Sequence, residues 1–442
     1  MVTIKSRLKS SCLVVVATLA MAASAGAVDI AGQRAVITRS LDAQYSRLDA
    51  LYKDIHAHPE LGFQETRTAA KLAAEMRALG YEVTEKVGRT GLVAIYKNGP
   101  GPTIMVRTDL DALPMPEKTG LPYASKATQM WRGKETPVMH ACGHDIHMAV
   151  WVAVAKIMLD MKDQWSGTLM FVGQPAEEGG GGALRMMADG LFERWPCDAV
   201  FAMHNMPGRA PGHFVFRDGA AMASSDYATI TIRGTGGHGA MPHRAADPVV
   251  AAASLVMALQ TVVARNVDPL QAAVVTVGAL HAGQANNVIP ASARLELSVR
   301  ALDRDVRALL ERRIRALAAA QAEGFGCRAE VDWRAGYAVL VNTPVETAFA
   351  REVALDLFGP DRVTPQGPPL TGSEDFAFML ERVPGSYLLI GNGRGEGDGP
   401  ASAACMVHHP GYDFNDANLP VGAAYWVALA ERFLSADETA PA

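Results

Sequence analysis

The sequence predicts an α/β protein whose larger domain holds a mostly parallel mixed sheet with helices on both faces. Strand-like and helical patterns alternate over most of the 442 residues, an order typical of such a sheet. Between residues 221 and 335 the order changes to β-α-β-β-α-β, and the first pattern then returns. We therefore expect a discontinuous larger domain over 28–220 and 336–442, into which a smaller α+β domain of ferredoxin-like type is inserted over 221–335.

The elements of the larger domain follow from the periodicity of its apolar residues. Helical spacing predicts helices at about 41–55, 66–79, 145–161, 345–358 and 420–434. Runs rich in β-forming residues predict strands at 91–96, 103–107, 167–172, 199–203 and 386–390. Pro59 and Gly80 end the first two helices, and a turn around Asn98-Gly99 separates the first two strands.

The inserted domain has its own set of elements. Its strands are expected at 227–232, 273–280, 293–300 and 328–333, and its helices at 248–264 and 303–322. This order suits a small two-layer unit with an antiparallel sheet.

The first 27 residues have the features of a signal peptide. A basic head contains Lys5, Arg7 and Lys9, a short apolar run follows, and small residues offer cleavage sites between Ala25 and Ala27. We expect an exported protein, periplasmic or secreted, although a buried N-terminal helix or an uncleaved anchor would have a similar pattern. The apolar run is shorter than the ~20 residues of a membrane span, and no later segment is expected to be long enough, so no stable membrane insertion is expected after cleavage.

Charge and composition limit the possible partners. Acidic residues number 46 and basic residues 41, giving a net charge of −5 with no basic run. Nucleic acid is therefore not an expected partner. Apolar residues make up 49%, which is typical of a globular protein and excludes a disordered one.

Five short patches concentrate the histidine, cysteine and acidic residues, and most of them follow predicted strands. They are Arg107–Asp111, His140–His147, Glu177-Glu178 with four glycines behind them, His204-Asn205 and His408-His409. Ligands bind at this edge of open α/β sheets. Each patch alone has an ordinary explanation, because a lone histidine is more often a surface group and a cysteine more often a small buried apolar residue.

Together, the patches contain a donor set for metal ions. Cys142 and His144 lie two residues apart on one loop, Glu178 supplies a carboxylate, and His204 and His409 supply imidazoles. Thiolate, imidazole and carboxylate are ligands of zinc and related divalent ions. Because five ligands exceed the three or four of a single catalytic zinc, we expect a pair of ions with a bridging hydroxide.

Three further carboxylates are expected to act around this centre. Glu177 is expected to face the bridging hydroxide and to act as general base. Asp109 and Asp145 either orient ligand imidazoles or fill ordinary turn and helix-cap roles.

Six motifs occur in an order that resembles a known family. They are His56–Phe63, Cys142–Asp145, Glu177–Gly182, Gly236–Ala240, Asn287–Pro290 and Tyr412–Asp416. The chain resembles the co-catalytic metallopeptidase family that contains aminoacylases and glutamate carboxypeptidases. It is most similar to the amidohydrolase branch with hippurate hydrolase and the plant auxin-conjugate hydrolases. Compared with the aminopeptidase-like branch, Arg107 stands where a metal-binding histidine is usual, and Cys142 where an aspartate bridges.

The resemblance implies roles for both domains. It implies two metal ions, zinc or manganese with cobalt or nickel also possible, held by the five ligands named above. It implies that the inserted domain is a lid that often forms a homodimer contact. It also implies that His238 polarises the scissile carbonyl, sometimes from the partner subunit. Asn287 and Arg300 match family positions near the substrate, although Arg300 could also be an ordinary arginine at a strand edge.

The expected function is hydrolysis of the amide bond of N-acyl amino acids such as hippurate. The first alternative is a metal-dependent carboxypeptidase or dipeptidase on small peptides. The second is a solute- or metal-binding protein of the cell envelope, against which Glu177 argues because a pure binder needs no base. Cys142, Cys197, Cys327 and Cys405 are too scattered to indicate a disulfide framework.

Overall fold

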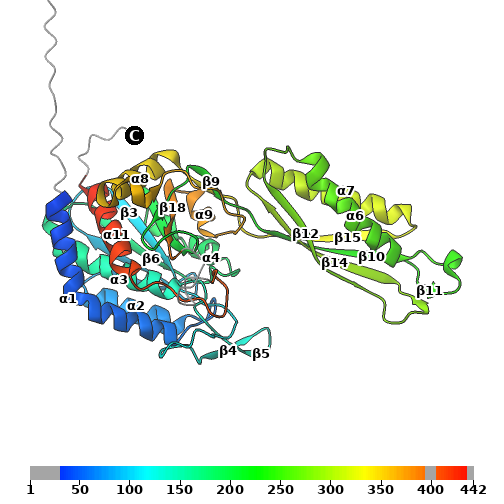
Figure 1. Cartoon of the computed structure of the whole chain (residues 1–442), viewed down its shortest axis with the longest axis horizontal. Coiled ribbons are helices and arrows are strands. Elements are labelled where there is room, and N and C mark those ends of the chain that lie inside the picture. The colour runs from blue at the N-terminus through cyan, green and yellow to red at the C-terminus, as the bar shows by residue number, and fades with distance from the viewer. Residues whose placement is uncertain (1–29, 394–404, 436–442) are drawn as a thin grey trace, which may run out of the picture.

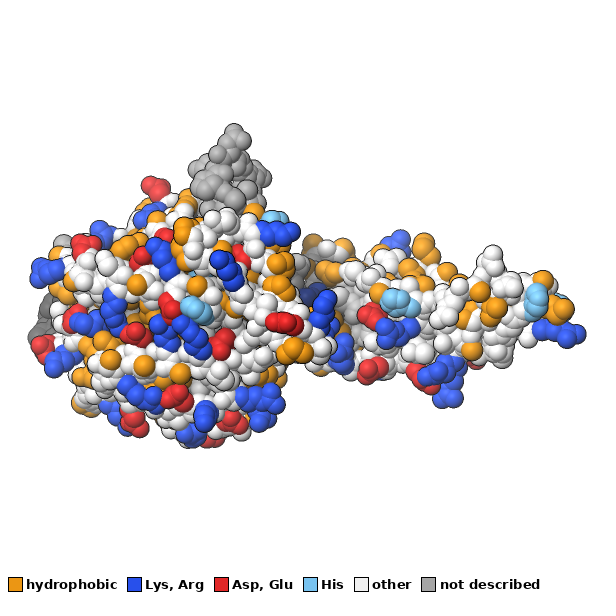
Figure 2. Space-filling view, turned by 90° about the horizontal axis from the view of Figure 1, so that it is seen from below, with side chains coloured by type: hydrophobic (Ala, Val, Ile, Leu, Met, Phe, Trp, Pro, Cys, Tyr) orange, Lys and Arg blue, Asp and Glu red, His pale blue; other side chains and the backbone are white. Residues whose placement is uncertain are grey.

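The computed structural model describes residues 30–393 and 405–435, which form two lobes joined by a narrow neck (Figures 1 and 2). The expected signal peptide lies outside the described residues. The larger lobe contains the early and late parts of the chain. The smaller lobe, here called the lid, contains residues 226–335.

An eight-stranded sheet in the order β1-β2-β6-β3-β7-β18-β8-β17 forms the larger lobe. Its strands are β1 (Glu82–Val87), β2 (Gly91–Lys97), β3 (Thr103–Asp109), β6 (Thr168–Gln174), β7 (Ala199–Met206), β8 (Phe214–Val215), β17 (Val363–Thr364) and β18 (Gly385–Gly391). The central strands β6, β3, β7 and β18 are parallel, whereas the β1–β2, β2–β6 and β18–β8 pairs are antiparallel. This mixed, mostly parallel sheet confirms the predicted fold class.

Helices cover both faces of this sheet. One face carries α1 (Ile30–Ala57), α2 (Thr66–Ala78), α3 (His144–Asp160), α8 (Pro344–Phe358) and α11 (Asn418–Leu434). The other face carries the shorter α4 (Gly182–Ala188), α5 (Leu191–Arg194) and α9 (Phe376–Leu380). Side chains alternate along β3, so that Ile104 and Val106 are buried in the first core and Met105 in the second.

The structure also contains pairings and short elements that the sequence patterns did not predict. The turn after β2 does not form a hairpin with β3, because β6 lies between the two strands. Outside the lid, the unpredicted elements are β1, β8, β17, the helices α4, α5 and α9, the hairpin of β4 (Thr128–Trp131) and β5 (Lys134–Pro137), and the pair of β9 (Gly219–Met222) and β16 (Leu340–Asn342). Short 3-10 turns lie at Lys162–Gln164, Pro242–Arg244 and Pro360–Arg362.

The lid has the predicted β-α-β-β-α-β order. Its elements are β10 (Asp226–Arg233), α6 (Pro248–Asn266), β12 (Ala273–Ala282), β14 (Ser292–Ala301), α7 (Arg304–Gly324) and β15 (Arg328–Ala335). The strands form an antiparallel sheet in the order β12-β14-β10-β15, with both helices on one face (Figure 1). Asp247 and Asp303 cap the starts of the two helices, because the Asp247 carboxylate accepts one backbone N–H of the first turn and the Asp303 carboxylate accepts two.

The far tip of the lid is formed by two short strands. β11 (Gly237–His238) pairs antiparallel with β13 (Val288–Ile289), at the end of the lid remote from the larger lobe (Figure 1). Two sequence motifs about fifty residues apart therefore lie side by side at this tip.

Helix α6 has an apolar face on each side. It is the one helix among the described residues that is long and apolar enough to cross a membrane, so the expectation that no later segment is long enough was wrong. Its inner face packs in the lid core through Leu255 and Leu259. On its outer face, Val250 is 49% exposed and Met257 is 71% exposed.

Candidate metal centre

The polar side chains predicted to bind metal lie mainly at one edge of the large sheet. β6, β3 and β7 are neighbouring parallel strands, so their carboxyl ends meet at the same edge. Asp109 ends β3, Glu177 follows β6, and His204 lies near the end of β7. His144 begins α3 at this edge. Segments far apart in sequence therefore converge where open α/β sheets bind ligands.

The loop before α3 has a backbone that only glycine can adopt without strain. Gly143 is the N-cap residue of α3, with φ +80°. A Cβ atom there would lie 2.4 Å from the Asn205 side-chain nitrogen, which donates a hydrogen bond to the Cys142 carbonyl over 2.7 Å. Gly143 thus allows Cys142 and His144 to face the same point from either side of the helix start.

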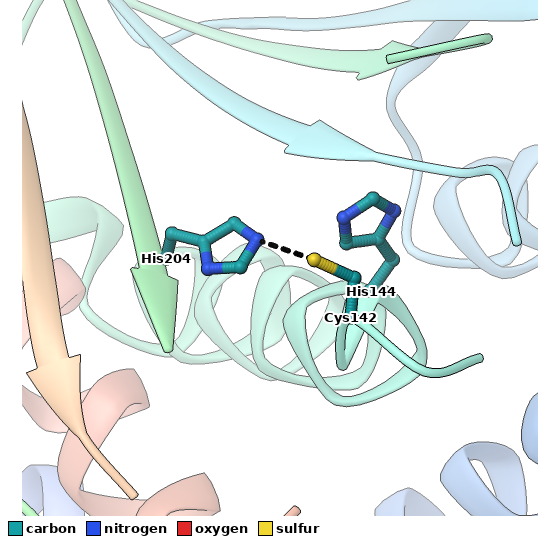
Figure 3. Close-up of side chains that lie close together, drawn as sticks. All are labelled: Cys142, His144 and His204. Atoms are coloured by element: carbon teal, nitrogen blue, oxygen red, sulfur yellow. Dashed lines mark hydrogen bonds between the residues drawn. The ribbon is translucent and has the colours of Figure 1, made fainter. Parts of the chain in front are cut away.

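Cys142, His144 and His204 converge on one point (Figure 3). Their donor atoms all lie within 4.8 Å of one another, and Cys142 Sγ is 3.4 Å from His204 Nε2. His204 Nδ1 lies 2.6 Å from the Asn205 carbonyl, which can only accept, so Nδ1 donates and Nε2 keeps its lone pair toward the sulfur.

The protein environment favours neutral forms of two of these groups. Burial, with the nearby Glu178 and Glu177 carboxylates, raises the pKa of the Cys142 thiol well above its usual range. Burial and the neighbouring His147 lower the pKa of His204 well below its usual range. A cation at this point would favour the thiolate and would bind the neutral imidazole.

His144 presents an unsatisfied nitrogen to the same point. Its Nδ1 donates to the Asp111 carbonyl over 2.8 Å, whereas its buried Nε2 has no hydrogen-bond partner among the described residues. That nitrogen lies 3.7 Å from an Asp109 oxygen and 4.0 Å from a Glu178 oxygen. Burial lowers the pKa of His144, but the carboxylates outweigh it and raise this pKa to about 10. A buried unpartnered nitrogen among anionic donors fits a metal ligand.

The two glutamates lie on a tight turn with an unusual backbone conformation. Ala176 has φ +50°, an unusual conformation for alanine, just before Glu177. Gly182 closes the turn so tightly that a Cβ atom would lie 1.6 Å from the Pro175 carbonyl oxygen. The Glu178 N–H donates to Asp111 Oδ2 over 2.9 Å, which fixes the direction of that residue.

Glu177 lies in a group of three buried carboxylates. Its ligand atoms and those of Glu374 and Asp375 lie within 4.8 Å of one another. Burial, followed by repulsion from Glu374 and Glu178, raises the pKa of Glu177 well above its usual range. This carboxyl group therefore has an enhanced affinity for a proton, as a general base that later acts as an acid requires.

The C-terminal histidine donor is a different residue from the one expected. The structure places His408, not His409, in a donor group with Cys142 and Glu178. His408 Nε2 lies 3.2 Å from Glu178 Oε1, whereas His409 Nδ1 accepts a hydrogen bond from the Gly411 N–H over 3.0 Å. Among the described residues, His409 belongs to none of the donor groups.

Asp109 and Asp145 make different contacts. Asp109 receives a hydrogen bond from His147 over 2.9 Å and one from Arg107 over 2.8 Å, and it lies beside His144 as described above. Asp145 instead pairs with His56 Nδ1 over 2.6 Å. Asp109 therefore contacts a predicted ligand imidazole, whereas Asp145 ties the start of α3 to the end of α1.

Sequence reasoning missed the acidic pair Glu374-Asp375 at the start of α9. Arg107 donates to Glu374 over 2.7 Å and lies 3.5 Å from Asp375. The one sequence signal was Arg107 itself, because a buried arginine requires carboxylate partners. Nothing in the sequence pattern indicated that this partner comes from residues more than 260 positions away.

The three lid residues lie in two places. His238 and Asn287 are exposed at the lid tip, where the Gly239 N–H donates to the Asn287 carbonyl over 2.8 Å. Because the tip is remote from the larger lobe, neither residue reaches the metal-ligand cluster of its own chain (Figure 1). Arg300 lies at the base of the lid, where it donates to Ser373 Oγ over 3.0 Å.

The donor groups fit a pair of cations. One group contains Cys142, His144 and His204, and another contains Cys142, Glu178 and His408. Cys142 belongs to both, so its sulfur lies between two sets of ligands. Sulfur, nitrogen and oxygen donors in this combination match zinc and related divalent ions. The cysteines are all free among the described residues, so no disulfide competes for this thiol.

Comparisons with known proteins match this architecture. The sequence profile described as "Peptidase family M20/M25/M40" matches residues 105–432. Hippurate hydrolase of Campylobacter jejuni is 41% identical over 400 residues, covering 90% of this chain and 99% of the relative. N-acetyl-L-cysteine deacetylase of Bacillus subtilis is 34% identical over 404 residues, covering 90% of this chain and 91% of the relative.

Solved structures share both lobes. The YXEP protein of Bacillus subtilis, described as a dinuclear metal-binding peptidase, is 31% identical with a TM-score of 0.75, covering 89% of this chain and 99% of that one. A putative aminohydrolase of methicillin-resistant Staphylococcus aureus is 30% identical with a TM-score of 0.81, covering 90% and 99%.

Proposed function

Because the chain belongs to peptidase family M20/M25/M40, and is therefore a metal-dependent hydrolase of C–N bonds, we propose that it removes the acyl group from N-acyl amino acids. The names of the two relatives above support this substrate class, because hippurate and N-acetylcysteine are both N-acyl amino acids. The observation that carries the proposal is the buried Glu177 carboxyl beside a complete thiol, imidazole and carboxylate donor set.

We assign the metal ligands as Cys142, His144, Glu178, His204 and His408. A pair of divalent ions held there would supply Lewis-acid polarisation of the amide carbonyl and a more acidic water. Zinc fits the thiolate best, and manganese, cobalt and nickel are the alternatives.

Glu177 performs the proton transfers in this proposal. Its carboxylate takes a proton from the attacking water, and the resulting carboxylic acid gives that proton to the leaving nitrogen. The surrounding carboxylates support the second step, because they stabilise the protonated form of Glu177. Without that proton the amino acid would have to leave as a nitrogen anion, which is a very poor leaving group.

Arg300 is positioned to select the substrate. It lies at the lid base, and its contact with Ser373 directs the guanidinium toward the larger lobe. A guanidinium there can hold the carboxylate of an N-acyl amino acid in a bidentate pair.

His238 acts on the substrate of a partner subunit in this proposal. Its position at the lid tip prevents it from reaching the metal centre of its own chain in this conformation. The apolar outer face of α6, with Val250 and Met257, supports a homodimer formed through the lid. Asn287, paired with the Gly239 backbone, would hold the tip in shape.

We also propose that the protein is exported, because residues 1–27 have the sequence pattern of a signal peptide. A reporter protein fused behind residues 1–27 should be recovered outside the cytoplasm, and a fusion with Lys5, Arg7 and Lys9 changed to Glu should not be.

A substrate screen tests the proposed function. Protein stripped of metal and reloaded with zinc, manganese or cobalt would be assayed on benzoyl-glycine, N-acetyl-cysteine and unblocked dipeptides. We expect hydrolysis of the acylated amino acids at rates at least tenfold above those of the dipeptides. Preferential cleavage of the dipeptides would instead establish the dipeptidase alternative.

A further inference from the structure

Tyr337 lies at the point where the chain returns from the lid to the larger lobe. It follows β15, and its backbone is paired with the outgoing segment before β10. The Ser225 N–H donates to the Tyr337 carbonyl over 3.1 Å, and the Tyr337 N–H donates to Ser225 Oγ over 3.1 Å. The backbone of Tyr337 is therefore fixed within the neck between the lobes.

The Tyr337 hydroxyl is inserted into the turn that carries the catalytic glutamate. It donates a hydrogen bond to the Glu177 carbonyl and accepts hydrogen bonds from the N–H groups of Gly179 and Gly181, over 2.9 and 3.2 Å. A phenol has one donor and two acceptor positions, and this turn uses all three. The ring packs edge-on against Phe378 of α9, with centroids 6.2 Å apart, which fixes the direction of the hydroxyl.

The two ends of the turn are held by other groups, because the Ala176 N–H donates to Glu65 over 2.7 Å and the Gly182 N–H donates to the Ala176 carbonyl over 3.2 Å. Glu178 is held by Asp111, and the Gly179 N–H also approaches the Glu177 carbonyl. Gly179 and Gly180 are exposed, and Ala176 at the start of the turn has an unfavourable φ. The Tyr337 hydroxyl bonds to the exposed middle of the turn, between these two ends.

The same neck connects this hydroxyl to the body of the lid. The Gly336 N–H donates to Asp226 Oδ1 over 3.1 Å, and Asp226 receives two hydrogen bonds of 2.7 Å from Arg307 of α7. Two adjacent residues of the neck therefore contact both lobes, since Gly336 bonds to Asp226 of the lid and Tyr337 bonds to the Glu177 turn.

We propose that Tyr337 is a positioning residue, whose hydroxyl holds the Glu177 turn in the conformation needed for proton transfer and connects that turn to the base of the lid. This inference rests on the proposed function for the role of Glu177, but the conformational effect of the hydroxyl can be measured without turnover.

Tyr337→Phe tests the inference, because it removes the hydroxyl and keeps the ring against Phe378. We expect kcat on an N-acyl amino acid to fall about 10- to 100-fold, with KM changed less than about threefold, because a misplaced base weakens the transition state more than substrate binding. Rates are counted per folded chain carrying its metal ions. Hydrogen exchange should become faster at the amides of residues 177–182 and stay unchanged in β3 and β7.

The matched control is Tyr227→Phe on lid strand β10, where the ring is 41% exposed. This variant should keep wild-type kcat and exchange rates. The inference is overturned if Tyr337→Phe keeps wild-type kcat per metal-loaded chain, or if the exchange of the 177–182 turn does not change. If the wild-type protein hydrolyses no N-acyl amino acid, the proposed function fails. The hydrogen-exchange measurement alone then decides whether the hydroxyl holds the turn.

Discussion

At the C-terminal donor, two adjacent histidines could supply one ligand, and backbone conformation distinguishes them. His408 has φ +66°, a left-handed conformation that directs its imidazole toward Glu178. His409 is instead engaged by the Gly411 N–H. The sequence alone could not separate them, because neighbouring residues in a loop have no fixed direction. The other donors follow helix starts and strand ends, whose directions are predictable from the sequence pattern.

The two histidines make a matched pair for metal analysis. In His408→Ala, the metal content after dialysis should fall from about two ions toward one per chain, because one cation loses a ligand. His409→Ala should retain the wild-type content. Elemental analysis of both purified variants gives the answer, and the reverse pattern would restore His409 as the ligand.

Substitution of Glu177 should reduce the rate of the chemical step without affecting metal binding. Glu177→Gln keeps the size and shape of the side chain but removes its basicity, so kcat should fall about 10²- to 10⁴-fold while metal content and folding stay unchanged. Glu193→Gln, in an exposed pair with Arg382, is the control and should have wild-type rates. Substantial turnover by the Glu177→Gln variant would require a different base.

At the scale of elements, a buried network ties α1 to α3 behind the metal centre. His56 at the end of α1 lies between Asp145 and Glu117, with contacts of 2.6 and 3.1 Å. Burial lowers the pKa of His56, but hydrogen bonds to the two carboxylates outweigh it and raise this pKa to about 10. His56 is therefore protonated near neutral pH and compensates two buried negative charges.

This network should make stability depend on pH in a defined direction. Because the folded pKa of His56 exceeds its unfolded value of about 6.5, its contribution is complete below pH 6.5 and is lost as pH rises toward 10. His56→Asn should lower the free energy of unfolding by about 3–5 kcal/mol at pH 7, because it leaves two buried carboxylates unpaired. The difference from wild type should shrink between pH 7 and pH 10.

Urea unfolding at several pH values, with metal in fixed excess, measures this difference. His58→Asn is the control, since His58 lies two residues away, just after α1, and its side chain is 53% exposed. A difference that stays constant from pH 7 to pH 10 would show that His56 is not protonated in the folded protein.

Most helices and strands were predictable, whereas the order of strands in the sheet was not. Periodicity depends on local burial, so α2 and the long lid helices appear where the pattern places them. Pairing depends on contacts between distant segments, and β2 pairs with β6 rather than with β3, which is closer in sequence. The exposed β4–β5 hairpin and the two-residue strands are too short or too polar to produce a pattern.

At the scale of the whole molecule, the lid separates two parts of one proposed active site. The proposed metal ligands lie in the larger lobe, Arg300 lies at the lid base, and His238 lies at the lid tip. A narrow neck joins the two lobes (Figure 2). The sequence predicted the inserted domain, but this distance between His238 and the ligands became visible only in the structure.

This separation leads to a prediction about mixed dimers. Glu177→Ala and His238→Ala should each be nearly inactive alone. In a mixed dimer, the His238→Ala subunit keeps an intact Glu177 and can receive His238 from the Glu177→Ala subunit, so one of the two sites is complete. With random pairing, half of the dimers are mixed, and the mixture should recover about a quarter of wild-type activity.

Co-expression of the two variants with different affinity tags, followed by tandem purification, isolates the mixed dimer. Its activity should be about half that of the wild type, since one site in two is complete. The control is a mixed dimer of Glu177→Ala with the double variant Glu177→Ala/His238→Ala, which has no intact base and should be inactive. A mixed dimer no more active than its parents would show that His238 does not act across the interface, and a protein that stays monomeric during purification would exclude a dimer formed through the lid.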